Sequence, residues 1–215
     1  MGRPAHSNSH VEEVQLAIID ATLKVFRLKG YRGISLSAIA RELNWSPTAL
    51  YRYFSSKDDL VAAVRAKGYI QVEHLLARSK ANSTNPRDAV GQAMRDFLRF
   101  AVTNPELCRL MYDLHQSEVP ASASAQQARE RAFCVVRSLA SDAVDAGIFQ
   151  GDANLNAHIC WASVHGLALL AVTGQLDLGC DFDDLVEPLI HRLSAPLADN
   201  SSNAVSEIAS DTKVN

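Results

Sequence analysis

A short run of slim side chains in the N-terminal quarter of the chain could read the edges of DNA bases. Ser46-Pro47-Thr48-Ala49 opens an expected helix, and side chains of this size let a helix enter a major groove about 12 Å wide. Tyrosines and cations follow within the next turns, and hydroxyl groups and cations are common ligands of phosphates. The predicted DNA contacts are Ser35, Ser37, Ser46, Pro47, Thr48, Tyr51, Arg52, Tyr53 and Lys57.

The phosphate ligands in this set have simpler alternatives. Tyr51 could be a core residue, as Phe54 is expected to be, and a solvated helix face would explain Arg52 equally well. Lys57 could be a solvated helix cap. A lysine in the first turn of a helix opposes the helix dipole, however, which gives a reason to expect an anion beside it.

The charge of the chain is unevenly distributed. The 215 residues carry a net charge of −3, but residues 1–55 hold seven basic and four acidic residues, a balance of +3, which leaves −6 for residues 56–215. A basic segment on an acidic body fits a protein that meets a polyanion at one end only. A protein that compacts DNA would instead need basic charge over its whole surface.

The residues around the slim run predict three helices. Apolar residues recur every three or four positions over 11–28, which indicates an amphipathic helix, and Lys29-Gly30 ends it. Ser35 or Ser37 can cap a second, short helix that contains Ala38, Ile39, Ala40 and Leu43. Asn44-Trp45-Ser46-Pro47 then supplies a turn, an N-cap serine and a first-position proline for a third helix at 47–54. Two short helices joined by a tight turn and packed on a longer one form a helix-turn-helix.

The remainder of the chain also predicts helices, and no run of residues alternates with the period of a strand. A fourth helix begins after Ser55 or Ser56, and others are expected at 86–103, 105–116, 124–146, 154–176 and 183–197. The predicted fold is all-α with about nine helices. Its parts are a flexible N-terminal arm (1–10), a helix-turn-helix DNA-binding domain (11–56), a helical effector-binding and dimerisation domain (57–197) and a disordered tail (198–215).

The helix expected at 154–176 is apolar on nearly every side. Such a helix must be buried all round, and a second copy of the chain can cover the face that one small domain leaves open. Together with the broad apolar stripe of the last helix, it predicts a four-helix seam between two copies. The predicted seam residues are Val164, Leu167, Ala168, Ala171, Leu185 and Leu189.

Aromatic and sulfur-containing side chains of the same region could line a hydrophobic cavity for a small effector. The predicted ligand contacts are Phe97, Phe100, Met111, Phe133, Trp161 and His165. Ordinary core packing is the alternative for each of them. A lone histidine on an apolar helix is more often a satisfied core residue than a ligand contact.

The sequence lacks the usual marks of an enzyme or a metalloprotein. A Gly-rich phosphate loop, a Gly-x-Ser-x-Gly elbow and a His-Glu-x-x-His motif are all missing, and the histidines and carboxylates do not form the cluster that a helical metal site needs. The four cysteines are far apart and are expected to be buried reduced thiols. We therefore expect no catalysis, no metal and no cofactor.

The sequence also predicts a protein that stays in the cytoplasm, with no membrane partner. The longest apolar run, at 166–172, is far shorter than the roughly 18 to 20 residues that cross a bilayer. Residues 1–8 are polar and lack the apolar region of a signal peptide.

The spacing Leu-Tyr-x-x-Phe-x-x-Lys-x-x-Leu runs unbroken from Leu50 to Leu60. With Leu23-Lys24-Val25-Phe26 through Gly30-Tyr31 and Ser35 through Leu43, this segment resembles the TetR family of bacterial repressors. The resemblance implies an all-helical homodimer with a ligand pocket in its C-terminal body, and it implies that Tyr51 contacts the DNA backbone.

Two other segments bear on this resemblance. Asn44-Trp45 stands where the family usually has a glycine and a small aliphatic residue. Asparagine tolerates the left-handed backbone that a turn needs, and Trp45 could add a packing contact or a DNA contact outside the usual set. In the C-terminal body, Trp161 with His165-Gly166 resembles a motif found in a subset of these repressors, and Gly166 would permit close approach of another helix.

The resulting hypothesis is a cytoplasmic homodimeric repressor that binds a palindromic double-stranded DNA operator and responds to a small hydrophobic effector. The alternatives are a corepressor-dependent or activating regulator, and a ligand-binding or scaffolding protein whose helix-turn-helix has lost its affinity for DNA. The sequence leaves open the operator, the effector and the direction of its effect. It also leaves open whether Gly2-Arg3-Pro4 reaches into the minor groove.

Overall fold

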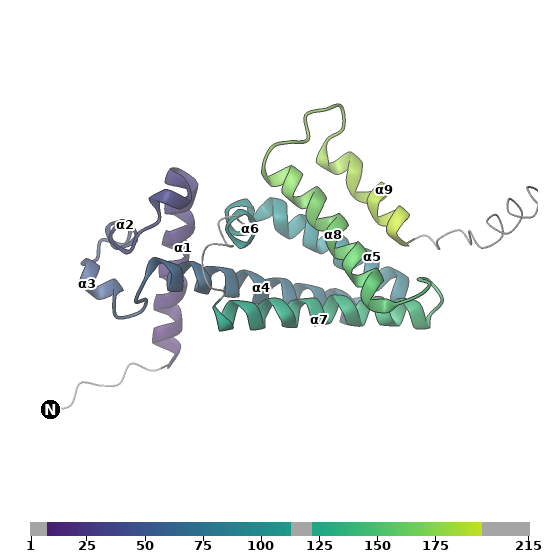
Figure 1. Ribbon diagram of the computed structural model, residues 1–215, viewed down its shortest axis with the longest axis horizontal. Coiled ribbons are helices and arrows are strands. Elements are labelled where there is room, and N and C mark those ends of the chain that lie inside the picture. The colour runs from purple at the N-terminus through teal and green to yellow at the C-terminus, as the bar shows by residue number, and fades with distance from the viewer. Residues whose placement is uncertain (1–7, 113–121, 195–215) are drawn as a thin grey trace, which may run out of the picture.

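The computed structural model describes residues 8–112 and 122–194, and every regular element in these ranges is a helix (Figure 1). The helices are α1 (Asn8–Gly33), α2 (Leu36–Glu42), α3 (Pro47–Leu50), α4 (Lys57–Asn82), α5 (Pro86–Thr103), α6 (Pro105–Met111), α7 (Ala123–Asp145), α8 (Ala153–Val172) and α9 (Phe182–Ser194). The predicted all-α fold with about nine helices is confirmed for the described part of the chain. The Gly2-Arg3-Pro4 segment and the tail predicted at 198–215 lie outside it.

Serine N-caps begin α2, α3 and α4. In each cap the hydroxyl oxygen accepts a hydrogen bond from the backbone N–H three residues further on, which satisfies one of the donors that a helix leaves open at its start. The pairs are Ser35 with Ala38 N at 3.1 Å, Ser46 with Ala49 N at 3.3 Å and Ser56 with Asp59 N at 3.0 Å.

Two residues with positive φ shape the N-terminal unit. Gly30, at φ 65°, interrupts the helical backbone inside α1 at the point where the sequence predicts the end of the helix. Asn44, at φ 56°, turns the chain between α2 and α3, so the expectation that asparagine can take the left-handed conformation here is confirmed. The buried side chains of Ile39, Ala40 and Leu50 hold the unit together.

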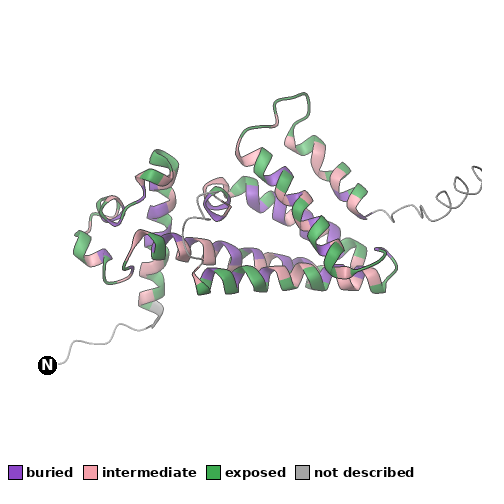
Figure 2. Ribbon diagram, viewed as in Figure 1, coloured by how far each residue is buried: buried purple, intermediate pink, exposed green. Residues whose placement is uncertain are grey.

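α4 joins the N-terminal unit to the rest of the molecule (Figure 1). It packs on α1 and then against α5, α6 and α7, while α8 packs on α5 and α7, and α9 lies against α5 and α8. Buried residues follow the facing sides of these helices, and their outer sides are exposed (Figure 2). A helical body is thus attached to the helix-turn-helix through α4 and through a contact between α1 and α6.

The helix bounds differ from the predicted ones mainly at the ends. Residues 8–10, predicted as part of a flexible arm, form the first turn of α1. The third helix, predicted at 47–54, is only Pro47–Leu50 and is followed by a turn at 51–53. α8 ends at Val172 rather than at residue 176, because Thr173 and Gly174 close it. α5 coincides with its predicted range.

α8 also differs from the expectation about membranes. It is the one helix among the described residues that is long and apolar enough to cross a bilayer by length and composition, although the apolar runs of the sequence predict none. Uninterrupted apolar runs do not reveal this helix, because isolated polar residues such as Asn156 and Ser163 break such runs without making the whole helix polar. The core helix of a soluble protein passes the same test.

Candidate nucleic-acid interface and interior cavities

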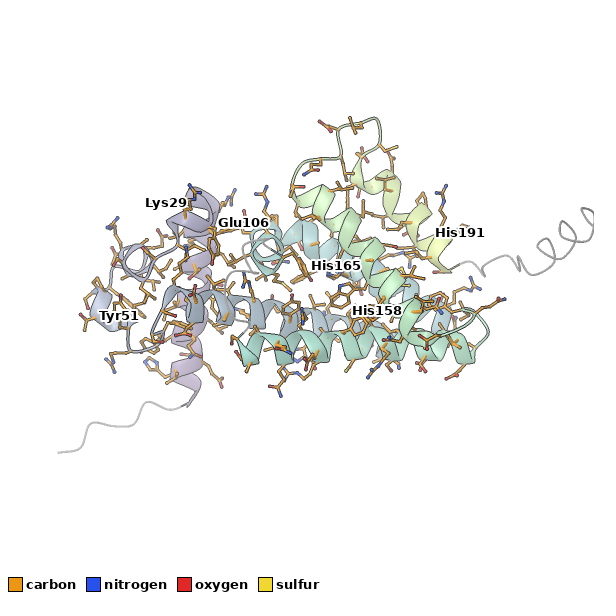
Figure 3. All side chains as sticks on the ribbon, in the orientation of Figure 1. Lys29, Tyr51, Glu106, His158, His165 and His191 are labelled. Carbon is orange, nitrogen blue, oxygen red and sulfur yellow. The ribbon has the colours of Figure 1, made fainter. Side chains whose placement is uncertain are left out.

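The predicted base-reading edge lies on the surface of the N-terminal unit. Ser46, Pro47 and Thr48 are exposed at the start of α3, and Tyr51 follows with 57% of its surface exposed. Figure 3 shows Tyr51 at the end of the molecule farthest from the body. Leu50 and Phe54 are buried beneath this edge. Their packing anchors the segment and leaves its small and hydroxyl-bearing side chains on the surface.

Some of the remaining predicted DNA contacts are exposed, and others already make hydrogen bonds or packing contacts within the chain. Ser37 and Arg52 are exposed, whereas the hydroxyl oxygens of Ser35 and Ser46 already accept cap hydrogen bonds. A serine hydroxyl that accepts one hydrogen bond can still donate another. Tyr53 is half-buried, with its ring centroid 6.3 Å from that of Trp45. Trp45 thus makes the packing contact that the sequence left open.

Lys57 makes a structural contact that the sequence pattern does not predict. Its Nζ donates a hydrogen bond to the backbone carbonyl oxygen of Tyr31 at 2.7 Å and lies 4.0 Å from the centroid of the Tyr31 ring. The ammonium group therefore fastens the start of α4 to the end of α1 and also gains a cation–π contact. If Lys57 contacts a phosphate, the same ammonium group must also keep, or give up, its contacts with Tyr31.

The body contains two small apolar cavities on either side of one histidine. The first has a volume of about 50 Å³ and is lined by apolar side chains of α4, α5, α7 and α8 together with the rings of Phe97, Phe149, Trp161 and His165. The second has a volume of about 130 Å³ and is lined by Cys108, Tyr112, His165, Ala168, Leu169 and Val172. Pockets that bind drug-sized ligands usually have volumes of about 300 to 1,000 Å³, so a large effector would have to displace side chains to enter.

Three of the six predicted ligand contacts line these cavities, namely Phe97, Trp161 and His165. Phe100 and Met111 are buried elsewhere in the core. Phe133 is half-buried and lies beside His158 and Trp161, with ring centroids 4.6 Å and 5.3 Å away. Tyr112 and Cys108 are lining residues that sequence reasoning missed, since their contact with α8 depends on how distant parts of the chain pack.

His165 is held in one orientation inside the body (Figure 3). Its Nδ1 lies 2.7 Å from the backbone carbonyl oxygen of Trp161, and its ring stacks on the Trp161 ring with a centroid distance of 4.5 Å. Phe97 and Tyr112 contact the same ring, with centroids 4.6 Å and 4.7 Å away. Burial lowers the pKa of His165 from 6.5 to about 4, so the imidazole is neutral at physiological pH.

Two buried polar atoms next to the second cavity have no hydrogen-bond partner among the described residues. They are Nε2 of His165 and Oη of Tyr112. Burial raises the pKa of Tyr112 well above 10, and it raises the pKa of the Cys108 thiol to about 12. Both groups are therefore protonated at neutral pH, and Cys108 is an unreactive thiol.

α8 faces the body with a different side from the predicted one. Val164, Leu167 and Ala168, which the sequence assigns to a seam between two chains, are buried within a single chain because this side of α8 packs on α5, α6 and α7. Ala171, Leu185 and Leu189 are half-buried. The exposed side of α8 instead carries an apolar stripe of Leu155, Ile159, Ala162, Gly166, Leu169 and Leu170.

α6 connects the second cavity to the N-terminal unit. Tyr112 directly follows α6, and Glu106 in the first turn of the helix lies 3.5 Å from Arg27 of α1. Arg65 of α4 donates a hydrogen bond from Nε to the carbonyl oxygen of Leu110 at 3.0 Å. A shift of α6 would therefore reach both α1 and α4.

An ion pair of the body joins α5 to α9. Arg95 of α5 donates two hydrogen bonds to Glu187 of α9, at 2.6 and 2.8 Å, and this pairing lowers the pKa of Glu187.

Among the described residues, no group of three or more histidine, cysteine, aspartate or glutamate side chains could hold a metal ion.

Comparison with protein families gives two matches that together cover most of the chain. The model described as "Bacterial regulatory proteins, tetR family" matches residues 18–64, which include the helix-turn-helix. The model described as "Tetracyclin repressor-like, C-terminal domain" matches residues 89–193 of the body.

Curated relatives are regulators with the same kind of DNA-binding unit. The HTH-type transcriptional regulator Rv1816 of Mycobacterium tuberculosis is 29% identical over 149 residues, which is 67% of this chain and 61% of the relative. The match thus spans about three fifths of the length of this relative. A shorter match, 40% identical over 63 residues and covering 29% of this chain and 26% of the relative, is to the uncharacterized regulator Rv0472c of the same species.

Solved structures share the fold. A protein with unknown function from Rhodococcus sp. RHA1 superposes with a TM-score of 0.73 at 25% identity, covering 89% of this chain and 97% of its own. The transcriptional regulator FadR from Bacillus subtilis, solved in complex with stearoyl-CoA, has a TM-score of 0.72 at 15% identity over 83% of this chain and 97% of its own. The second likeness shows the fold alone.

Proposed function

Because the chain belongs to the TetR family of bacterial regulatory proteins, we propose that it is a ligand-responsive, DNA-binding transcriptional repressor. In this proposal two copies bind one palindromic operator in the cytoplasm, and a small apolar effector releases them. Its partners are double-stranded DNA, the effector and a second copy of the chain. Catalysis, a cofactor and a membrane have no part in it.

The observation that carries the proposal is the exposed start of α3, which is anchored by the buried side chains of Leu50 and Phe54. Ser46, Pro47 and Thr48 are slim enough to approach base edges, and the exposed Tyr51 beside them offers a hydroxyl group to a phosphate. Thr48 offers both a hydroxyl for hydrogen bonds and a methyl group for the thymine methyl. We assign base reading to Thr48 and backbone positioning to Tyr51, Arg52 and Lys57.

The apolar stripe on α8 supports the homodimer. Its large members Leu155, Ile159, Leu169 and Leu170 leave an exposed hydrophobic surface, and a Cβ added to Gly166 would have no atom within 4 Å outside its own helix backbone. A second copy related by a two-fold axis can bury this stripe against its own, with Gly166 letting the helices approach closely. The two α3 edges would then enter successive major grooves about 34 to 36 Å apart.

Coupling between effector and operator is assigned to α6. An effector in the cavity beside Tyr112 would shift the end of α6, and the contacts of Glu106 with Arg27 and of Arg65 with Leu110 would pass this shift to α1 and α4. The resulting change in the separation of the two α3 edges lowers affinity for the operator. By thermodynamic linkage, operator DNA lowers affinity for the effector by the same factor.

The test is fluorescence anisotropy of the purified protein on DNA from upstream of its own gene, with a scrambled fragment as competitor and a salt series. We expect saturable binding of two copies per site that resists the competitor. Thr48→Ala should alter base preference more than overall affinity, whereas Thr103→Ala, a change of an exposed threonine on α5, should alter neither. Equal, weak binding to both DNAs that vanishes with salt would contradict the proposal.

A further inference from the structure

The described residues that line the cavity of about 130 Å³ between α6 and α8 offer a ligand no polar surface. They are Cys108 and Tyr112 at the end of α6 and His165, Ala168, Leu169 and Val172 of α8. Nε2 of His165 and Oη of Tyr112 are buried out of reach of a water molecule, so the two rings present only carbon atoms to the cavity. A molecule in this space therefore contacts carbon and sulfur atoms alone.

The lining groups are also uncharged at neutral pH. Burial lowers the pKa of His165 from 6.5 to about 4, so its imidazole is neutral. Burial raises the pKa of the Cys108 thiol to about 12 and the pKa of Tyr112 well above 10, so both groups stay protonated. None of the described lining residues can therefore balance the charge of an ionic ligand.

An apolar, uncharged wall excludes polar ligands because it cannot replace the hydrogen bonds that they make with water. A hydroxyl, amine or carbonyl group gives up these bonds on entry, and one such unpaired group weakens binding by about tenfold or more. A carboxylate or an ammonium group also loses the hydration of its charge, which costs far more. A hydrocarbon loses no hydrogen bond, and its transfer out of water is favourable.

The volume of the cavity sets the size of the molecule. An apolar cavity of roughly 150 Å³ stays dry and holds one benzene ring, so about 130 Å³ suits a single ring or a short branched chain. The first cavity, of about 50 Å³, borders the other side of His165. The His165 ring is stacked on Trp161 and packed against Phe97, which keeps the two cavities separate. Two fused rings therefore exceed the available space.

We propose that the cavity between α6 and α8 binds an uncharged hydrocarbon of about the size of one benzene ring, without any hydrogen-bonding group. The inference rests on the proposed effector function and names the chemical class of the effector. The bound molecule would lie between Tyr112 at the end of α6 and Val172 of α8. Because Glu106 of α6 pairs with Arg27 of α1, a displacement of α6 by the hydrocarbon would reach the DNA-binding unit.

The test is isothermal titration calorimetry of the full chain with four probes, namely toluene, phenol, benzoate and naphthalene. Toluene and phenol have nearly the same shape and differ only in a methyl group against a hydroxyl group. We expect phenol to bind about tenfold or more weakly than toluene, because its hydroxyl finds no partner. Benzoate should not bind, because nothing in the wall balances its charge. Naphthalene should bind more weakly than toluene, because it exceeds the volume of the cavity.

Substitutions in the wall locate the binding site. Ala168→Leu adds an isopropyl group to the wall and should abolish toluene binding, whereas Ala77→Leu, the same change at an exposed position of α4, should leave it intact. Val172→Ala removes methyl groups from the wall and should raise the affinity for para-xylene relative to toluene. In the wild-type protein, the ring current of bound toluene should shift the methyl NMR signals of Val172, at the end of α8, far more than those of Leu155 near its start. This last measurement needs no substitution.

The outcomes separate this inference from the proposed function. Phenol or benzoate that binds as tightly as toluene, no binding of toluene up to its solubility limit, or toluene binding that survives in Ala168→Leu would each overturn the hydrocarbon site. Selective binding of toluene without any effect on the affinity for operator DNA would support the hydrocarbon site and contradict its role as the effector site. Toluene binding needs no DNA, so a protein that binds toluene selectively but binds no operator would contradict only the proposed function.

Discussion

At the scale of single residues, the buried neutral His165 makes stability depend on pH. Its pKa is about 4 in the folded protein, against 6.5 in an exposed chain, so between these values the unfolded state binds a proton that the folded state does not. The free energy of unfolding is thus highest above pH 6.5 and falls as the pH drops toward 4. For a shift of this size the loss is roughly 3 kcal/mol.

Urea unfolding at pH 7 and at pH 4.5 checks this dependence. Wild-type protein should lose about 2 to 3 kcal/mol more between these pH values than His165→Phe does. Tyr112 and Cys108 line the same cavity and stay protonated over this range, because burial raises the pKa of each. They therefore do not contribute to the change in unfolding free energy between these pH values. His158→Phe, a change of an exposed histidine on the same helix, is the control. An acid sensitivity that persists in His165→Phe would assign it to other groups.

Lys57 is a second residue whose two roles can be separated. Lys57→Ala removes the hydrogen bond to the Tyr31 carbonyl and should lower the free energy of unfolding by about 1 kcal/mol. If the ammonium also contacts a phosphate, the variant should bind operator and random DNA more weakly alike, with the slope of log K against log salt reduced by about 1. Anisotropy over a salt series measures this slope. Lys67→Ala, further along α4, should leave it unchanged, and an unchanged slope in Lys57→Ala would restrict Lys57 to joining α4 and α1.

At the scale of helices, the crossing of α4 and α6 depends on one glycine. A Cβ at Gly68 would lie 2.2 Å from Sδ of Met111, which is fully buried. Gly68→Ala should therefore push α6 away from α4 and lower the free energy of unfolding by about 1 to 3 kcal/mol, as overpacked cores do. The control is Gly91→Ala on α5, where the nearest atom is the movable end of Arg95 at 3.3 Å. If the two variants unfold at the same urea concentration, the crossing is looser than this contact implies.

The helices also show where sequence reasoning stops. The start of α3 was predictable, because a serine cap and a proline act through hydrogen bonds and sterics within four residues. The inward face of α8 was not, since the helix is apolar on nearly every side and its pattern cannot tell which side meets α5 and which is left exposed. The pairing of Tyr112 with His165 joins residues more than fifty positions apart, so only the packing of α6 on α8 reveals it.

At the scale of the whole molecule, one side of α8 packs within its own chain, and the other side is proposed to contact a second copy. One pair of variants can distinguish these two roles. Val164 lines the first cavity and is buried, whereas Ile159 is 43% exposed on the apolar stripe. A glutamate at Val164 would place an unpaired charge in the core of one chain and should unfold it. A glutamate at Ile159 would meet its own symmetry mate across a two-fold interface. It should therefore separate the two copies and leave each of them folded.

Light scattering and circular dichroism together decide between these outcomes. Ile159→Glu should give a folded monomer that binds the operator far more weakly, because the two α3 edges are no longer held one helical turn of DNA apart. Val164→Glu should lose helical signal at any concentration, and Leu16→Glu, a change of an exposed leucine on α1, should remain a folded dimer. A dimer that persists in Ile159→Glu would move the interface to another face of the body. The spacing of the two recognition edges would then have to be set by contacts other than those of the α8 stripe.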